Sequence, residues 1–119
     1  MVELFREFTF EAAHRVPNYS DVHGHSFQVG VVMRGPADAT HGWVASLTDI
    51  EPHIKTVQRQ LDHKYLNDIE GLAVPSLENV ARWIWNKLDN TVPHLDRVEV
   101  RRGGPGHGEG CVYRGRIAA

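Results

Sequence analysis

Two long runs of alternating residues, separated by a short polar segment, constrain the fold of this chain more than any other feature. From Val2 to His14 the even positions are mostly apolar, and from His23 to Met33 the odd positions are mostly apolar. Alternation with a period of two is typical of strands that bury one face. The segment from Val16 to Asp21 between the runs contains the turn residues Pro, Asn, Ser and Asp. The pattern therefore predicts two antiparallel strands joined by a loop.

Three histidines lie where these two strands would meet. His23 and His25 are two residues apart in the second run, so their side chains share one face of the strand, roughly 7 Å apart. Gly24 between them leaves the opposite face open. Antiparallel pairing places the end of the first strand beside the start of the second, which brings His14 alongside. A catalytic zinc typically has three protein ligands and one open position, so His14, His23 and His25 are the predicted metal ligands.

Two helices and two shorter strands are expected in the rest of the chain. The first helix is expected to begin at a cap formed by Thr48 or Asp49, with Pro52 in its first turn, and to end near Leu61. The second begins at the cap Ser76. Strands are expected around residues 97–101 and 111–115, joined by the glycine-rich segment 103–110. Apolar residues recur at helical spacing in both helices: Ile50, Ile54, Val57 and Leu61, then Leu77, Val80, Ala81, Ile84 and Leu88. The order ββααββ predicts one α+β domain over residues 1–119.

Charge and cysteine content exclude several classes of function. The formal net charge of −2 gives no electrostatic footprint for nucleic acid or an anionic membrane, so neither is an expected partner. No apolar run approaches the roughly 18–20 residues of a membrane span, and no basic-then-apolar signal pattern is present. The single cysteine, Cys111, excludes an internal disulfide and favours a cytoplasmic location. Eight histidines are the one unusual feature, and they favour metal or acid–base chemistry.

Several segments together identify a family resemblance. The segments FTFEAAHR (8–15), HGHSF (23–27), LDHKYLN (61–67), PSLEN (75–79) and GCVYRG (110–115) occur in one order along almost the whole chain. In sequence, order and approximate spacing they resemble the 6-pyruvoyl / 6-carboxytetrahydropterin synthase family. The resemblance implies the T-fold, in which a four-stranded antiparallel sheet carries two helices on one face. It also implies homo-oligomers, either trimeric barrels or stacked hexamers, with active sites between subunits.

The resemblance also implies a chemistry for particular residues. His14, His23 and His25 match the family's zinc ligands, and Asp62 and His63 match its acid–base pair. Zinc would stabilise the negative charge that develops on side-chain oxygens of a reduced pterin. Asp62 would orient the imidazole of His63, which would move a proton near neutral pH. Bacterial members convert 7,8-dihydroneopterin triphosphate to 6-carboxy-5,6,7,8-tetrahydropterin, acetaldehyde and triphosphate on the queuosine route, whereas animal-type members make 6-pyruvoyltetrahydropterin.

Two positions depart from the family pattern. The family usually has a cysteine base shortly before the His-Gly-His segment, which this chain lacks. Asp21 is the candidate replacement, and Tyr19 is a weaker one. The family's pterin-anchoring glutamate aligns with Arg102. Either Glu109 in the glycine-rich segment takes over as the anchor, or Arg101, Arg102 and loop N–H groups form an anion site.

Three functional hypotheses follow from these residues. The first is a zinc-dependent lyase of the 6-carboxytetrahydropterin synthase type. The second is a diverged paralogue that cleaves the side chain of dihydroneopterin by an aldolase-like reaction. The third is a non-catalytic T-fold subunit that binds zinc or a small ligand. His63 also has a purely structural interpretation, as the residue that ends the first helix.

Overall fold

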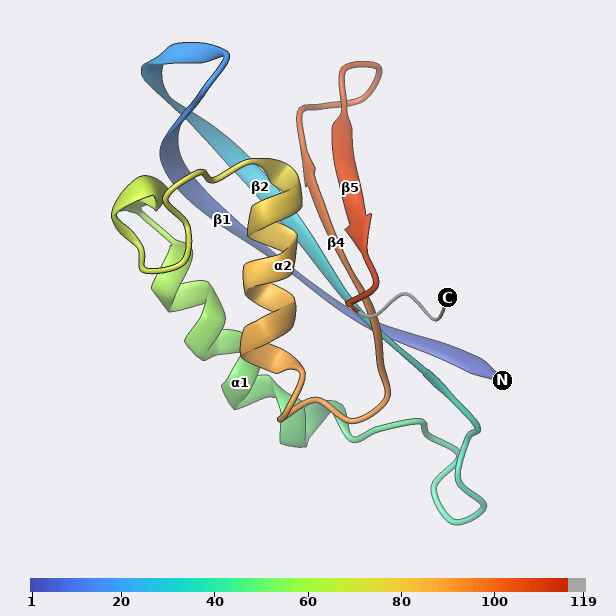
Figure 1. The fold of residues 1–119 in the computed structure, drawn as a ribbon. Helices are drawn as coiled ribbons and strands as arrows, with labels where there is room; N and C mark the ends of the chain where they lie inside the picture. Colours follow the sequence, from blue (N-terminus) through green and yellow to red (C-terminus); the bar gives the residue numbers. More distant parts are fainter. Residues whose placement is uncertain (116–119) are drawn as a thin grey trace.

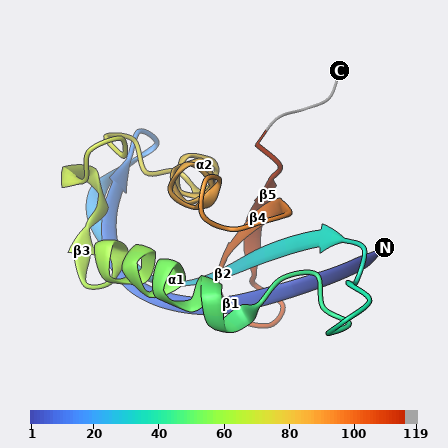
Figure 2. The ribbon, with the colours of Figure 1, turned by 90° about the horizontal axis from the view of Figure 1, so that it is seen from below.

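Two helices lie on one face of a twisted sheet in the computed structural model, which describes residues 1–115 apart from the side chain of Ser20 (Figures 1 and 2). The sheet order is β3-β1-β2-β4-β5. Helix α1 packs over β1, and α2 packs over β4 and β5. The strands are β1 (Val2–Val16), β2 (Tyr19–Gly35), β3 (Lys64–Tyr65), β4 (Leu95–Arg102) and β5 (Glu109–Tyr113); the helices are α1 (Leu47–Leu61), α2 (Leu77–Leu88) and the short 3-10 helix η1 (Leu66–Asp68).

The β1–β2 hairpin is longer than the sequence predicted. Only Pro17 and Asn18 separate the two strands, so most of the expected loop is strand. The antiparallel register places His14 directly opposite His23, which agrees with the prediction that His14 lies alongside His23 and His25. The register then shifts before Val16 pairs with Tyr19. The hairpin thus fixes the histidines at its closed end.

The sheet has the four antiparallel strands expected of the T-fold and one more. β1, β2, β4 and β5 are antiparallel neighbours. β3 pairs parallel with β1 at Ala12 and Ala13, which makes the sheet mixed. Two residues are too few to show a periodic pattern, so the sequence did not reveal this strand. Its position matters because it directly follows Asp62 and His63.

The helices begin where serine side chains cap them. Ser76 caps α2 as predicted, accepting a hydrogen bond from the amide of Asn79. The predicted cap of α1 at Thr48 or Asp49 is wrong, because Ser46 caps it by accepting from Asp49 N. Pro52 therefore lies in the second turn rather than the first, where its missing N–H costs a helical hydrogen bond. The predicted apolar stripes are buried in both helices, with Leu77 only partly buried.

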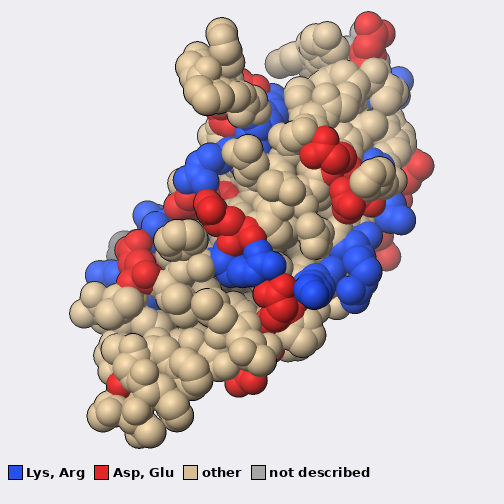
Figure 3. Space-filling model, turned by 180° about the vertical axis from the view of Figure 1, so that it is seen from behind, with Lys and Arg blue, Asp and Glu red and all other residues tan. Residues whose placement is uncertain are grey.

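The face of the sheet without helices carries charges of both signs (Figure 3). Arg97 is the centre of a network in which its guanidinium contacts the carboxylates of Glu3, Asp96 and Glu99 at 2.8–3.0 Å. Phe5 lies at the surface with 61% of its area exposed. No helix in residues 1–115 is both long and apolar enough to cross a membrane.

Candidate metal centre and active site

Three imidazoles converge at the closed end of the β1–β2 hairpin. His14 is fully buried, while His23 and His25 are partly buried. Their ring centroids are 4.6–5.0 Å apart, and each ring offers a nitrogen within 4.8 Å of the others. The alternation of β2 and the register with β1 produce this arrangement, as the sequence predicted.

Backbone carbonyls orient two of the three rings. His14 Nδ1 lies 2.9 Å from the carbonyl oxygen of Pro75, and His23 Nδ1 lies 3.0 Å from that of Asp21. A carbonyl oxygen only accepts hydrogen bonds, so Nδ1 of each ring carries the hydrogen and Nε2 presents a lone pair. Such a contact to the second nitrogen is typical of metal-binding histidines.

The donor set fits a divalent cation. The Nε2 atoms of His14 and His23 are 3.0 Å apart, close to the roughly 3.3 Å between two ligands of a tetrahedral zinc. With both Nδ1 atoms protonated, no hydrogen is available between them in the neutral rings. His25 Nε2 is buried and has no hydrogen-bond partner within residues 1–115. A buried unpaired polar atom costs about 1–3 kcal/mol, and a cation held by the three imidazoles would remove that cost.

Burial favours the neutral form of these histidines. Loss of hydration lowers the pKa of His14, and it lowers the pKa of His25 to about 4, with the Arg102 guanidinium adding to both effects. A metal binds the neutral imidazole, so protons compete weakly for these nitrogens at neutral pH. His14 and His25 are therefore ready to bind a cation without first losing protons.

Asp62 and His63 lie at the outer edge of β1. Asp62 Oδ1 accepts from the amide of Glu11 at 2.9 Å, and its Oδ2 lies 2.9 Å from His63 Nδ1. The Glu11 N–H, and then His63, hold the pKa of Asp62 below its usual value. His63 has a left-handed backbone (φ +59°), and 80% of its side chain is exposed. An ionised carboxylate thus orients an imidazole whose Nε2 faces away from it.

This pair and the three histidines do not meet within one chain. No hydrogen bond, ion pair or ring contact joins His63 to His14, His23 or His25 in the described part of the chain. Asp62 ends α1, as the cap residue, and His63 directly precedes β3. Within residues 1–115 the acid–base pair and the metal centre are therefore separate groups without direct contact.

Asp21 contributes its backbone to the metal centre. Its carbonyl orients His23, whereas its carboxylate is exposed and makes no hydrogen bond or ion pair with the side chains that the structure describes, which do not include that of Ser20. The ring of Tyr19 packs against that of His23, with centroids 4.5 Å apart. Both candidate replacements for the thiol base therefore lie next to a predicted metal ligand.

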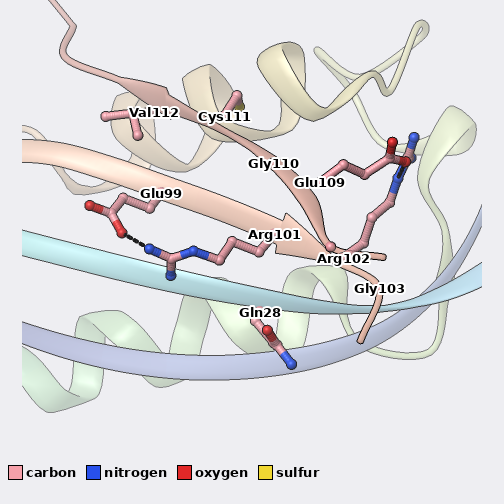
Figure 4. A pocket seen from close by; sticks show the side chains of 10 residues that line it. Gln28, Glu99, Arg101, Arg102, Gly103, Glu109, Gly110, Cys111 and Val112 are labelled. Atoms are coloured by element: carbon pink, nitrogen blue, oxygen red, sulfur yellow. Dashed lines mark hydrogen bonds and ion pairs between the residues drawn. The ribbon is translucent and has the colours of Figure 1, made fainter. Parts of the chain in front are cut away.

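Arg102 and Glu109 form a pair on the same face of the sheet as His25. Arg102 lies opposite Phe27 in the register, and its Nε donates to Glu109 Oε1 at 2.7 Å. Arg101 points to the other face, where it pairs with Glu99 (Figure 4). Consecutive strand residues face opposite sides, so the two arginines do not form one anion site. A cavity of about 520 Å³ lies along this β4–β5 hairpin.

The family model described as 6-pyruvoyl tetrahydropterin synthase matches residues 3–116. The chain belongs to this family. A 6-carboxy-5,6,7,8-tetrahydropterin synthase from Synechocystis is 38% identical over 107 residues, covering 82% of this chain and 83% of the relative. A dihydroneopterin monophosphate aldolase from Pyrococcus furiosus is 31% identical over 87 residues, covering 71% of this chain and 73% of the relative.

The fold is also that of a solved member of the 6-pyruvoyl tetrahydropterin synthase family. The structure of the Caenorhabditis elegans 6-pyruvoyl tetrahydropterin synthase superposes with a TM-score of 0.85. The match covers 97% of this chain and 96% of that protein, at 28% sequence identity. The predicted T-fold is therefore confirmed.

Two backbone carbonyls have roles at the metal centre that the residue types alone did not indicate. The carbonyls of Pro75 and Asp21 orient metal-site histidines, and a backbone atom leaves no signal in residue type. Cys111 instead packs against the core, and burial raises the pKa of its thiol. A thiol with a raised pKa is mostly protonated at neutral pH, so Cys111 is a poor replacement for the family's cysteine base.

Proposed function

We propose that this chain is a zinc-dependent lyase that converts 7,8-dihydroneopterin triphosphate and water to 6-carboxytetrahydropterin, acetaldehyde and triphosphate. The observation that carries the proposal is the convergence of three imidazoles, of which two are oriented by backbone carbonyls and the third has a buried nitrogen without a hydrogen-bond partner among the described residues. The 38% identical Synechocystis enzyme supports the choice of reaction. His14, His23 and His25 would hold the zinc, which supplies Lewis-acid stabilisation of negative charge on substrate oxygens.

The remaining chemistry is assigned to acid–base side chains of the chain. His63 would carry a proton at Nε2, and the ionised Asp62 would hold its Nδ1–H and stabilise the imidazolium. The exposed carboxylate of Asp21 is the proposed base in place of the family's thiol. Its position two residues before His23 puts it at the edge of the metal centre.

The proposed pterin anchor is Glu109. Arg102 Nε donates to Glu109 Oε1, which leaves Oε2 available to accept from N–H groups of a pterin edge. Glu109 is on the same face of the sheet as His25, and its side chain is 61% exposed. Anchor and metal centre therefore lie at the same end of the same face.

The separation of His63 from the metal centre favours an assembly of several copies. We propose trimers, single or stacked as hexamers, in which the acid–base pair of one subunit faces the metal centre of another. Two free sheet edges support this proposal, because β5 and the part of β1 before Ala12 have no neighbouring strand within residues 1–115. Unpaired edges are suited to joining subunits through backbone hydrogen bonds.

A second candidate function is aldolase-like cleavage of a dihydroneopterin side chain to a 6-hydroxymethyl product. Two observations favour it. The segment before His23 contains no thiol, and the Pyrococcus furiosus aldolase is 31% identical over most of its length. Proton transfer by His63 and charge stabilisation by the metal would serve either reaction.

Product analysis distinguishes these functions. Zinc-loaded protein is incubated with dihydroneopterin triphosphate and, separately, with dihydroneopterin and its monophosphate, and the products are identified by mass spectrometry. We expect a 6-carboxy product and an equal amount of acetaldehyde from the triphosphate, and none after treatment with a chelator. A 6-hydroxymethyl product would establish the aldolase instead. Absence of turnover with zinc bound would contradict both and leave the non-catalytic subunit.

A further inference from the structure

Three consecutive carbonyls of the loop before α2 each accept a hydrogen bond from a side-chain nitrogen. Asn67 Nδ2 donates to Ala73 O at 3.4 Å, and Asn79 Nδ2 donates to Val74 O at 2.8 Å. The third carbonyl, of Pro75, is the one that accepts from His14 Nδ1 at 2.9 Å. The loop that orients a metal-site histidine is therefore itself held by two asparagines.

The orientation of both amide groups is fixed by their second contacts. Asn67 Oδ1 accepts from the backbone N–H of Arg15 at 2.8 Å, and Asn79 Oδ1 accepts from Arg82 Nη2 at 2.8 Å. Each donor has a hydrogen to give and cannot accept, so the amide oxygen must face it. The NH₂ groups consequently face the loop carbonyls, to which they donate hydrogen bonds.

Asn67 joins the two parts of the protein that meet at His14. It binds both the N–H and the C=O of Arg15, the residue after His14 on β1, at 2.8 and 2.7 Å. Its NH₂ group also reaches the loop two residues before Pro75. Asn79 holds the same loop from the first turn of α2, whose cap Ser76 follows Pro75. Figure 1 shows this loop beside the closed end of the hairpin.

We propose that Asn67 and Asn79 are positioning residues of the metal centre. By holding residues 73–75 they keep the Pro75 carbonyl against His14 Nδ1, which keeps the lone pair of His14 on Nε2. If the loop relaxes, the buried ring of His14 loses the contact that selects its tautomer and its orientation. The inference rests on the proposed metal site, although not on the identity of the reaction.

The test uses isosteric substitutions that remove only the NH₂ donors. Asn67→Asp and Asn79→Asp keep the acceptor oxygens but place a second oxygen against the loop carbonyls. Asn86→Asp, on the exposed side of α2, introduces the same charge and is the matched control. Zinc affinity is measured by competition with a chromophoric chelator. The Co²⁺ visible spectrum reports ligand geometry, and ¹⁵N shifts of His14 in the metal-free protein report its tautomer.

We expect zinc affinity to fall roughly tenfold in each variant, at the lower end of the effect of outer contacts on metal sites. We also expect a changed Co²⁺ spectrum, a mixed His14 tautomer and no more than a twofold change in the control. A lower melting temperature with unchanged affinity, spectrum and tautomer would overturn the proposal and leave a structural role. If an aspartate variant does not fold, the uncharged substitution Asn67→Ser is measured in the same way. Wild-type protein that binds no zinc would refute the proposed function, whereas wild-type binding with unaffected variants would refute this inference alone.

Discussion

Replacing His25 with leucine is expected to weaken zinc binding by about 10³-fold, because one of three imidazole ligands is lost. The same change should leave the metal-free protein at least as stable as the wild type at neutral pH. His25 Nε2 is buried without a hydrogen-bond partner in residues 1–115, and leucine removes that unpaired atom. An ordinary buried histidine would give the opposite result, since its loss would break a hydrogen bond. Chelator competition measures the affinity, and urea denaturation in a chelator measures the stability.

The pH dependence of the same two proteins provides a further check. The pKa of His25 is lowered to about 4 in the folded protein, below the ordinary value of 6.5. The unfolded chain therefore takes up a proton first as the pH falls, and the metal-free wild type loses stability between about pH 6.5 and 4. The metal-free His25→Leu protein should lose less stability than the wild type over that pH range. The control is His53→Leu on the exposed side of α1, which should leave zinc affinity unchanged. If His25→Leu also left zinc affinity unchanged, His25 would be excluded as a ligand.

Replacing His63 with glutamine is expected to lower kcat by about 10²- to 10⁴-fold, the usual contribution of a general acid–base group. Zinc affinity should stay within twofold, because His63 is 80% exposed and does not contact the metal-site histidines within the described residues. Asp62→Asn should lower kcat as well, since an amide cannot stabilise an imidazolium as a carboxylate does. Steady-state kinetics on the substrate established by product analysis, together with chelator competition, measure both quantities.

The control for His63 is His107→Gln in the glycine-rich loop, which should keep full activity. Mixed oligomers add a test of the proposed assembly, because an inactive His63→Gln subunit and an inactive His25→Leu subunit each retain what the other lacks. Turnover should reappear when the two are unfolded and refolded together. A His63→Gln protein with wild-type kcat would rule out the acid–base role of this residue.

The sequence predicted those features of the fold that follow from the regular spacing of side chains along strands and helices. Strand alternation put His23 and His25 on one face, and antiparallel pairing brought His14 alongside them, whereas the exact register that pairs His14 with His23 depends on the loop. Helical spacing likewise predicted the buried residues of α1 and, apart from Trp83, those of α2. The resemblance added Asp62 and His63, which the structure shows paired with each other.

Other features of the site were not predictable because they depend on single contacts. Ser46, Thr48 and Asp49 are all good helix caps, and only tertiary packing decides that Ser46 is used. The pairing of Arg102 with Glu109 depends on the register across a glycine-rich loop. Every residue has a backbone carbonyl, so the residue type at Pro75 does not show that its carbonyl orients a histidine. The hydrogen bonds by which Asn67 and Asn79 hold this loop are visible only in the structure.

X-ray absorption at the zinc edge, on wild-type protein loaded with one equivalent of zinc, tests the metal centre most directly. A centre built from His14, His23 and His25 predicts one zinc per chain with three imidazole nitrogens at about 2.0–2.1 Å and one further light ligand. Zinc that is lost on desalting, or a spectrum with fewer than three imidazole ligands, would contradict the proposed centre and the lyase chemistry that depends on it.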